Sequence, residues 1–326
     1  MLIRAVAPPR SAPVLCAALA VVLALSGCGG DGEGARPTVT VGLDFTPNAV
    51  HAPLYTAVRE GYDGDQGVRL RIRPPGTRPD SLRLLATGRA DLAVLDIHDL
   101  AIAREQGSDI VAVAALVQRP LAALIAQADV ARPRALEGRR VGVSGLPSDP
   151  AFLRAIVEHD GGDYGSIRQI TIGFNAVGNL VAKKIDAVPA FWNAEGVVLR
   201  ERGFRTREFR VDDFGAPPYP EVVLVATRKT LDRRRADIED SLAAIQSGVE
   251  ATLADPEPAA REIASAGGDA DLEVVRAQLR AVSPVLRPPL KLNRSVLEEW
   301  ARFDSQIGIV ERPPDVDRAF DFSLVD

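Results

Sequence analysis

Most of the side chains that could contact a small molecule follow short apolar segments of the chain. They are carboxylates, amides, histidines and aromatic rings, and the candidate contacts are Asp44, Phe45, Asn48, His51, Tyr55, Asp96, His98, Ser144, Gly145, Asn175, Trp192, Asn193, Glu195 and Tyr219. The chain has only 2 tryptophans and 4 tyrosines, so the position of Trp192, Tyr55 and Tyr219 in this set is informative. Aromatic walls with a few carboxylates and amides suit a flat, polar heterocycle.

Among these residues, Glu195 is the strongest indication of a ligand-binding site. It is expected in the first turn of a helix beside Trp192, where its carboxylate can accept a hydrogen bond from an exocyclic amine. The N-terminus of that helix also favours a negative charge. For Trp192 the alternative is a role in the hydrophobic core.

Simpler roles are open for several other candidates. Asp44, Asn48 and Asn193 could serve only as helix caps. His51 and His98 could be buried histidines whose ring nitrogens are satisfied by the protein itself, since the sequence pattern does not separate that role from ligand contact.

The elements that position these residues have the pattern of an α/β protein. Short β-branched runs alternate with segments of helical period, which is typical of parallel sheets joined by crossover helices. We expect strands at 38–43, 68–72, 90–95, 110–116, 121–126, 140–143, 167–172, 187–191 and 222–226. Ligands of such sheets bind beyond the carboxyl ends of the strands, which is where the candidates lie.

The expected helices follow these strands. Their ranges are 50–61, 81–87, 98–106, 149–159, a segment through Lys184, 193–203, 231–253, 258–266, 271–282 and 295–307. Asp149 followed by Pro150 predicts an N-cap with proline at the first helical position, and Asn193 is expected to cap another helix.

The order of the elements predicts two α/β lobes. The pattern restarts at Arg140, and after Ala226 only helices follow, which must pack on a sheet already built. We therefore expect a first lobe from residues 37–122, a second lobe from 123–224, and a return to the first lobe in 225–326. Two crossings between the lobes, near 118–126 and 221–227, would form a hinge with a ligand cleft between the lobes.

The N-terminus predicts export. Arg4 and Arg10 flank an apolar run, Val14 to Leu25, that is too short for a helix spanning the ~30 Å hydrocarbon core of a membrane, so residues 1–27 read as a signal peptide. The run Leu25, Ser26, Gly27, Cys28 resembles the lipobox of bacterial lipoproteins, in which the cysteine is acylated. Residues 28–36 would form a tether, and the alternative is an ordinary secretory signal with an incidental cysteine.

Composition excludes several other functions. Cys16 lies in the segment to be removed and Cys28 would carry lipid, so no thiol remains for a disulfide, a Cys-ligated metal or a nucleophile. A formal net charge of -5 argues against nucleic acid as a partner. No metal, cofactor or catalytic residue is predicted.

The run Gly42 to Asn48, with His51 and Tyr55, resembles the opening signature of the thiamine pyrimidine-precursor binding family, roughly L-D-(W/F)-x-P-N-x-x-H-x-x-(L/Y)-Y. Further matches follow in order through residues 88–93, 95–98, 145–150, 160–163, 173–175, 184–187, 191–196 and 211–219. The resemblance covers roughly residues 38–228.

The resemblance implies a type II periplasmic-binding-protein fold. It implies a monomeric, extracytoplasmic protein, lipid-anchored to the membrane, that delivers a thiamine-related aminopyrimidine to an ABC permease and its ATPase. By position, Asp44, Phe45, Asn48 and His51 would line the first-lobe half of the cleft, and Trp192, Asn193 and Glu195 the second. Phe45 and Trp192 would be stacking walls and Glu195 the amine acceptor.

Two other functions stay open at this level. Riboflavin is the main alternative ligand, because it too is a flat heterocycle with amide-like edges. A fungal enzyme of the same superfamily makes the thiamine pyrimidine and carries a cysteine-rich run in its second lobe. The matching residues here, Asp212 to Tyr219, contain no cysteine, and Leu95 and Asp96 stand near the position of the enzyme's cofactor lysine. The sequence therefore favours a binding protein over an exported enzyme.

Overall fold

The computed structural model describes residues 36–75, 80–145, 148–173, 175–268 and 270–325. These residues belong to one compact unit, Arg36–Asp326. The expected signal peptide, Cys28 and all but the last residue of the expected tether lie outside the described residues.

The first sheet combines the N-terminal strands with one strand from much later in the chain. Its order is β2-β1-β3-β10-β4, with β2 Arg69–Arg73, β1 Thr38–Gly42, β3 Leu92–Asp96, β10 Val222–Thr227 and β4 Ile110–Val117. β1 pairs in parallel with β2 and β3, whereas β10 runs antiparallel to both β3 and β4.

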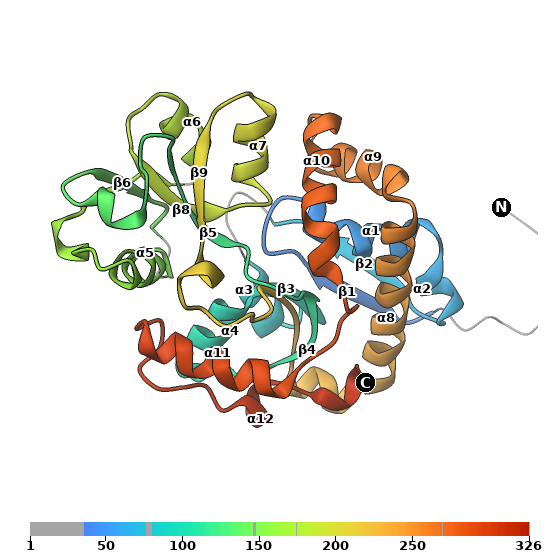
Figure 1. Cartoon of the computed structure of the whole chain (residues 1–326). Helices are drawn as coiled ribbons and strands as arrows, with labels where there is room; N and C mark the ends of the chain where they lie inside the picture. The colour runs from blue at the N-terminus through green and yellow to red at the C-terminus, as the bar shows by residue number, and fades with distance from the viewer. Residues whose placement is uncertain (1–35, 76–79, 146–147, 174, 269, 326) are drawn as a thin grey trace, which may run out of the picture. The chain divides into compact units, whose positions relative to one another are not determined.

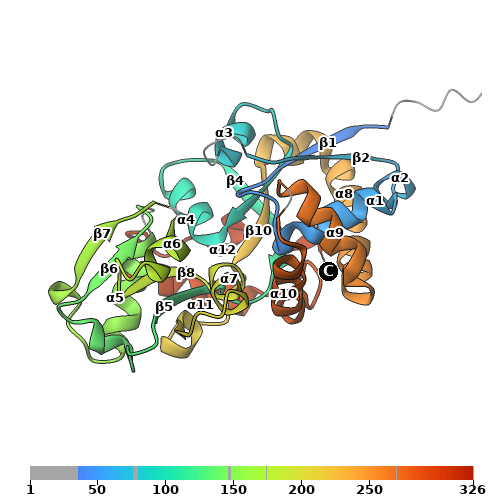
Figure 2. The ribbon, with the colours of Figure 1, turned by 90° about the horizontal axis from the view of Figure 1, so that it is seen from above.

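The second sheet repeats this plan with the middle of the chain. Its order is β7-β6-β8-β5-β9, with β7 Arg168–Thr171, β6 Arg140–Val143, β8 Ala187–Phe191, β5 Ala122–Gln127 and β9 Thr206–Arg210. β6 is parallel to β7 and β8, and β5 is antiparallel to β8 and β9. Figures 1 and 2 show the two sheets with their helices as separate halves of the molecule.

Each sheet contains one antiparallel strand beside the expected parallel ones. The antiparallel strands are β5 and β10, the two strands that begin directly after the chain has crossed from one sheet to the other. A strand that enters from the facing sheet runs opposite to strands that return over a crossover helix. β9 was not expected at all, because its sequence, Thr-Arg-Glu-Phe-Arg, is charged and occupies a sheet edge.

Helices cover both sheets. Their bounds are α1 Ala52–Arg59, α2 Tyr62–Asp65, α3 Ser81–Ala86, α4 Ile97–Glu105, α5 Ser148–His159, α6 Ala176–Val181, α7 Glu195–Glu201, α8 Arg228–Ala254, α9 Pro256–Ala266, α10 Leu272–Val282, α11 Arg294–Gln306 and α12 Val316–Ala319.

The observed ends of α5, α6 and α7 differ from the sequence-based expectation in ways that concern the candidate residues or their neighbours. α5 begins at Ser148, so Asp149 lies in its first turn, and its carboxylate bonds to Ser144 instead of serving as the N-cap. α6 ends at Val181, before Lys184. The N-cap of α7 is Ala194 and not Asn193.

The C-terminal segments return to the first sheet. α8 packs on α1 and contacts β1 and β4, and isolated bridges join Phe320 to Ala112 and Leu290 to Ala115 of β4. In this arrangement α10 of the returning part also contacts α7 of the second half, as Figure 1 shows.

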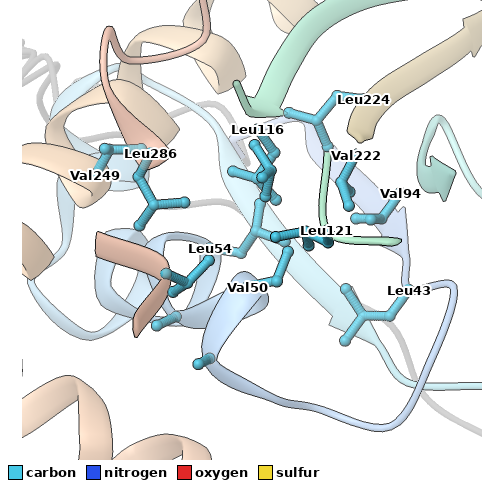
Figure 3. Packing of buried hydrophobic residues seen from close by; sticks show 14 of the residues in the cluster. Leu43, Val50, Leu54, Val94, Leu116, Leu121, Val222, Leu224, Val249 and Leu286 are labelled. Atoms are coloured by element: carbon cyan, nitrogen blue, oxygen red, sulfur yellow. The ribbon is translucent and has the colours of Figure 1, made fainter. Parts of the chain in front are cut away.

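The core runs through the junction between the sheets. One buried cluster contains Leu43 and Leu54 from the start of the chain together with Leu116 and Leu121, which flank the first crossing (Figure 3). Val222, at the start of β10, belongs to the same cluster. The two crossings are therefore packed inside the hydrophobic core, and they fix how the strand ends of the two sheets are presented.

Candidate ligand-binding site

Three candidate residues form one hydrogen-bonded group after β1. The Nδ1 atom of His51 accepts from the backbone N–H of Asn48 over 3.2 Å, and Asn48 Oδ1 accepts from the N–H of Val50 over 3.0 Å. Because Nδ1 is an acceptor, Nε2 carries the proton and donates to Asp44 Oδ1 over 2.8 Å. Asn48 thus caps the 3-10 turn Ala49–His51, and buried His51 holds the side chain of Asp44.

Phe45 and Tyr55 lie next to this group in the chain. Phe45 is a large apolar side chain that is 44% exposed, so its ring is accessible to a ligand. Tyr55 is half-buried, and burial together with the charge of Glu262 raises its pKa to about 12. Its hydroxyl therefore stays protonated and can donate a hydrogen bond.

Trp192, Asn193 and Glu195 follow β8 in the second sheet. Glu195 Oε2 accepts from the N–H of Phe191 over 3.1 Å, and burial raises the pKa of its carboxyl. The side-chain oxygen of Asn193 is buried and has no hydrogen-bond partner among the described residues. A buried amide oxygen without a partner is a ready acceptor for a ligand donor.

The structure places Trp192 in the junction between the sheets. Its Nε1 donates to the carbonyl oxygen of Pro120 over 3.0 Å, and its backbone N–H donates to Leu121. The guanidinium of Arg210 lies 4.1 Å from the ring centroid, and the side chain is only 5% exposed. One face of the indole is therefore already covered by a cation.

Ser144, Gly145 and Asn175 follow β6 and β7, which run parallel to β8, so they lie at the same edge of the second sheet as Glu195. The hydroxyl of Ser144 donates to Asp149 Oδ2 over 2.7 Å. Gly145 has a φ of 98°, a backbone conformation that residues other than glycine rarely adopt. Asn175 is exposed, and its side chain makes no capping hydrogen bond to the N-terminus of α6.

Asp96, His98 and Tyr219 form a different, interior group. His98 is buried, its Nδ1 lies 2.9 Å from Asp304 Oδ2, and its backbone N–H donates to Asp96 Oδ1 over 2.8 Å. The ring of Tyr219 meets the His98 ring edge-on at 4.9 Å. These three candidates are therefore brought together, but in the interior.

The electrostatics of this interior group are strongly perturbed. Burial raises the pKa of Asp96 well above its ordinary value, and burial raises the pKa of Glu221 to about 7. Burial alone would lower the pKa of His98, but the charges of Asp304 and Asp96 raise it overall. The neighbouring carboxyls therefore favour the protonated form of His98, whereas burial favours the neutral forms of Asp96 and Glu221.

Sequence reasoning did not select Asp304. Asp304 lies in a long polar helix, α11, with nothing in its spacing to distinguish it from surface carboxylates. Glu221 directly precedes β10, and this position already places it among the polar side chains beside the strand ends in the sequence.

The described residues form a surface pocket of about 470 Å³ away from these groups. It lies between α5 and the end of α11, lined by Arg154, Glu158, Tyr164 and Gln306, and includes none of the candidates. The cleft between the lobes and the binding roles of the candidate residues stay predictions.

Comparison with known proteins decides the family. The family model described as "NMT1/THI5 like" matches residues 48–259, well over half of the chain. The chain belongs to the NMT1/THI5-like family. The formylaminopyrimidine-binding protein of Halalkalibacterium halodurans is 31% identical over 245 residues, which cover 74% of this chain and 74% of that protein.

The NMT1/THI5-like relatives also include enzymes. The 4-amino-5-hydroxymethyl-2-methylpyrimidine phosphate synthase THI5 of Saccharomyces cerevisiae is 24% identical over 241 residues, covering 69% of each chain. Membership of the NMT1/THI5-like family is therefore compatible with binding proteins and with synthases.

Solved structures confirm the predicted fold. The periplasmic aliphatic sulphonate binding protein SsuA of Escherichia coli superimposes with a TM-score of 0.71 at 16% identity, covering 86% of this chain and 96% of that one. A ligand-binding component of an ABC-type import system from Staphylococcus aureus also gives a TM-score of 0.71, at 17% identity, over 89% and 98% of the two chains. The NMT1/THI5-like chain thus has the periplasmic-binding-protein fold, and no helix within its described residues is long and apolar enough to cross a membrane.

Proposed function

We propose that this chain is the solute-binding protein of an ABC importer and captures a thiamine-related aminopyrimidine of the formylaminopyrimidine or hydroxymethylpyrimidine type. The observation that carries the proposal is the 31% identity to a formylaminopyrimidine-binding protein over 74% of both chains. The group after β1 supports it, because exposed Phe45 stands beside Asp44, whose carboxylate is held by His51.

Each half of the molecule contributes a different kind of contact. Phe45 supplies the face on which the pyrimidine stacks, and Asp44 accepts from a ring substituent. Glu195 accepts from the exocyclic amine, while the free oxygen of Asn193 accepts a second donor. Trp192 forms the opposite wall once the guanidinium of Arg210 moves off its ring. Closure of the two halves about the crossings would then exclude water and strengthen these polar contacts.

The enzyme alternative has little support in this chain. Its only cysteines are Cys16 and Cys28, so the region of Asp212 to Tyr219 has none of the thiols expected there in the fungal enzyme. The proposal includes export, and lipid attachment at Cys28 with the protein monomeric at the outer face of the cell membrane. Labelling with a radioactive fatty acid in a bacterial host checks the anchor: Cys28→Ser should lose the label and Cys16→Ser should keep it.

Calorimetric titration with formylaminopyrimidine, hydroxymethylpyrimidine, thiamine and riboflavin tests the ligand. We expect one aminopyrimidine to bind with a Kd of about 1 μM or tighter, which corresponds to roughly -8 kcal/mol. Phe45→Ala should weaken binding at least tenfold, since about 1.4 kcal/mol of stacking is lost. Phe204→Ala is the matched control, because Phe204 is 40% exposed against 44% for Phe45 but lies after α7, away from the candidate residues.

The outcomes separate the alternatives. Binding of riboflavin alone would keep the transport role and replace the ligand. Product formed from a bound pyrimidine would move the chain to the synthase class. Equal affinities of the Phe45→Ala and Phe204→Ala variants would remove Phe45 from the site.

A further inference from the structure

Three side chains with metal-binding chemistry meet where β3 ends and β10 begins: His98 and Glu221 are buried and Asp96 is partly buried. Asp96 and Val222 are paired in the sheet, which brings Asp96 and His98 close to Glu221. One potential ligand atom from each of Asp96, His98 and Glu221 lies within 4.8 Å of those of the other two. Ligands at ~2.1 Å from a common ion are separated by up to about 4 Å, so a small inward movement completes such a site.

Two side chains of the group each have one polar atom without a protein partner among the described residues. His98 and Glu221 are 1% and 0% exposed, and neither Nε2 of His98 nor Oε1 of Glu221 has a hydrogen-bond partner among the described residues. A buried polar atom left without a partner costs about 1–3 kcal/mol, so a native chain rarely keeps two in one group without a further binding partner.

The other atom of each side chain is already held. Nδ1 of His98 lies 2.9 Å from Asp304 Oδ2, the arrangement in which a carboxylate orients a metal-binding imidazole. Glu221 Oε2 accepts from the N–H groups of Leu121 and Ala122, and Asp96 Oδ1 accepts from the N–H of His98. Nε2 of His98 and Oε1 of Glu221 are therefore available to a metal ion.

The group contains more acidic side chains than basic ones. Asp96, Glu221 and Asp304 are three carboxylates in the interior, and in the described part of the chain no lysine or arginine forms an ion pair with any of them. Within the described ranges, His98 is the basic side chain that pairs with Asp304 and lies beside Asp96. A divalent cation bound there would compensate the negative charge of these carboxyl groups in their ionised form.

We propose that Asp96, His98 and Glu221 bind one divalent transition-metal ion, with Asp304 as the residue that orients His98. Two carboxylates and one imidazole suit Zn²⁺ and Mn²⁺. Tyr219, whose buried hydroxyl also has no partner among the described residues and whose ring lies 4.9 Å from that of His98, closes one side of the group. Because Glu221 also accepts a hydrogen bond from the backbone N–H of Leu121, the ion would link the first crossing between the sheets to β10.

Titration of the full chain with Zn²⁺ and with Mn²⁺ tests the proposal. Cys16→Ser and Cys28→Ser are introduced first so that thiols do not bind the metal, and the protein is stripped with a chelator and dialysed. We expect one ion per chain. Asp96→Asn, His98→Gln and Glu221→Gln should each weaken binding at least about tenfold, and Asp304→Asn about tenfold through loss of orientation of His98. Thr252→Val, at a buried position far from the group in sequence, should leave the metal affinity unchanged.

A second measurement keeps the group intact in case the buried variants do not fold. The chain has 3 histidines, so His51→Gln with His159→Gln leaves His98 as the only imidazole. In nuclear magnetic resonance spectra of that variant, one equivalent of Zn²⁺ should shift the resonance of Nε2 in the remaining imidazole ring. The proposal fails if the stripped chain binds neither ion, or if the His98 signals stay unchanged while an ion binds.

Discussion

The indole Nε1 of Trp192 donates a hydrogen bond over 3.0 Å to the carbonyl oxygen of Pro120, which joins the end of β8 to the first crossing between the sheets. Pro120 is buried, so loss of the donor would leave its carbonyl oxygen without a partner. Trp192→Phe should therefore lower the free energy of unfolding in urea by about 1–3 kcal/mol beyond the effect of the smaller ring.

The second tryptophan is the matched control for this change. Trp300 is fully buried, but its Nε1 has no hydrogen-bond partner among the described residues. Trp300→Phe removes a similar volume without breaking a hydrogen bond, so it should cost less than Trp192→Phe. An equal or larger loss for Trp300→Phe would show that the bond to Pro120 contributes nothing measurable.

The carboxyl of Glu195 predicts a trade between stability and binding. Burial raises its pKa above the unfolded value of about 4.3, so its contribution to stability is present below that pH and is lost as the pH rises through the folded pKa. Glu195→Gln should therefore unfold with a higher free energy than the natural chain at pH 7, and the difference should shrink below about pH 4. The same variant should bind the aminopyrimidine more weakly.

Glu201→Gln controls for the change of charge, because Glu201 lies exposed at the end of the same helix, α7. Urea unfolding at pH 4 and at pH 7 provides the comparison. A pH dependence that is the same for both variants would contradict a special environment at Glu195.

A buried hydrogen bond joins α1 to α8. Thr252 Oγ1 donates to Thr56 Oγ1 over 2.9 Å, and both side chains are fully buried. Thr252→Val should lower the free energy of unfolding by about 1–3 kcal/mol, because it leaves the hydroxyl of Thr56 unsatisfied. Adding Thr56→Val removes that hydroxyl too, so the double variant should regain part of the loss. Strict additivity of the two changes would argue against a direct bond.

Gly248 in α8 allows the close approach of α1. A Cβ added at this position would lie 2.2 Å from the carbonyl oxygen of Pro53 and 3.0 Å from Cβ of Ala57. In an exposed helix, replacement of glycine by alanine stabilises by about 1 kcal/mol, but here the clash with backbone outweighs that gain. We expect Gly248→Ala to lower the melting temperature, whereas Gln246→Ala on the exposed face of α8 should leave it nearly unchanged.

The apolar segments and the local family motif could be read from the sequence with good accuracy. β6 and β8 have the predicted bounds, and the four long C-terminal helices lie within a few residues of their expected ranges. These elements depend on periodicity and on residues close in the chain. The group of Asp44, Asn48 and His51 is local for the same reason, since its members fall within 8 residues of one another.

The contacts that only the tertiary structure could show join residues that are distant in the chain. The pairing of His98 with Asp304 spans 206 positions, and that of Glu221 with the N–H of Leu121 spans 100. The direction of β5 and β10 depends on which sheet each strand joins after a crossing. Trp192 illustrates the limit well: its position after β8 was visible in the sequence, but its bond to Pro120 and its cover by Arg210 arise from packing. The sequence by itself determined the α/β elements and the family, because short-range pattern and motif specify them, whereas the direction and burial of the polar side chains were decided by long-range contacts.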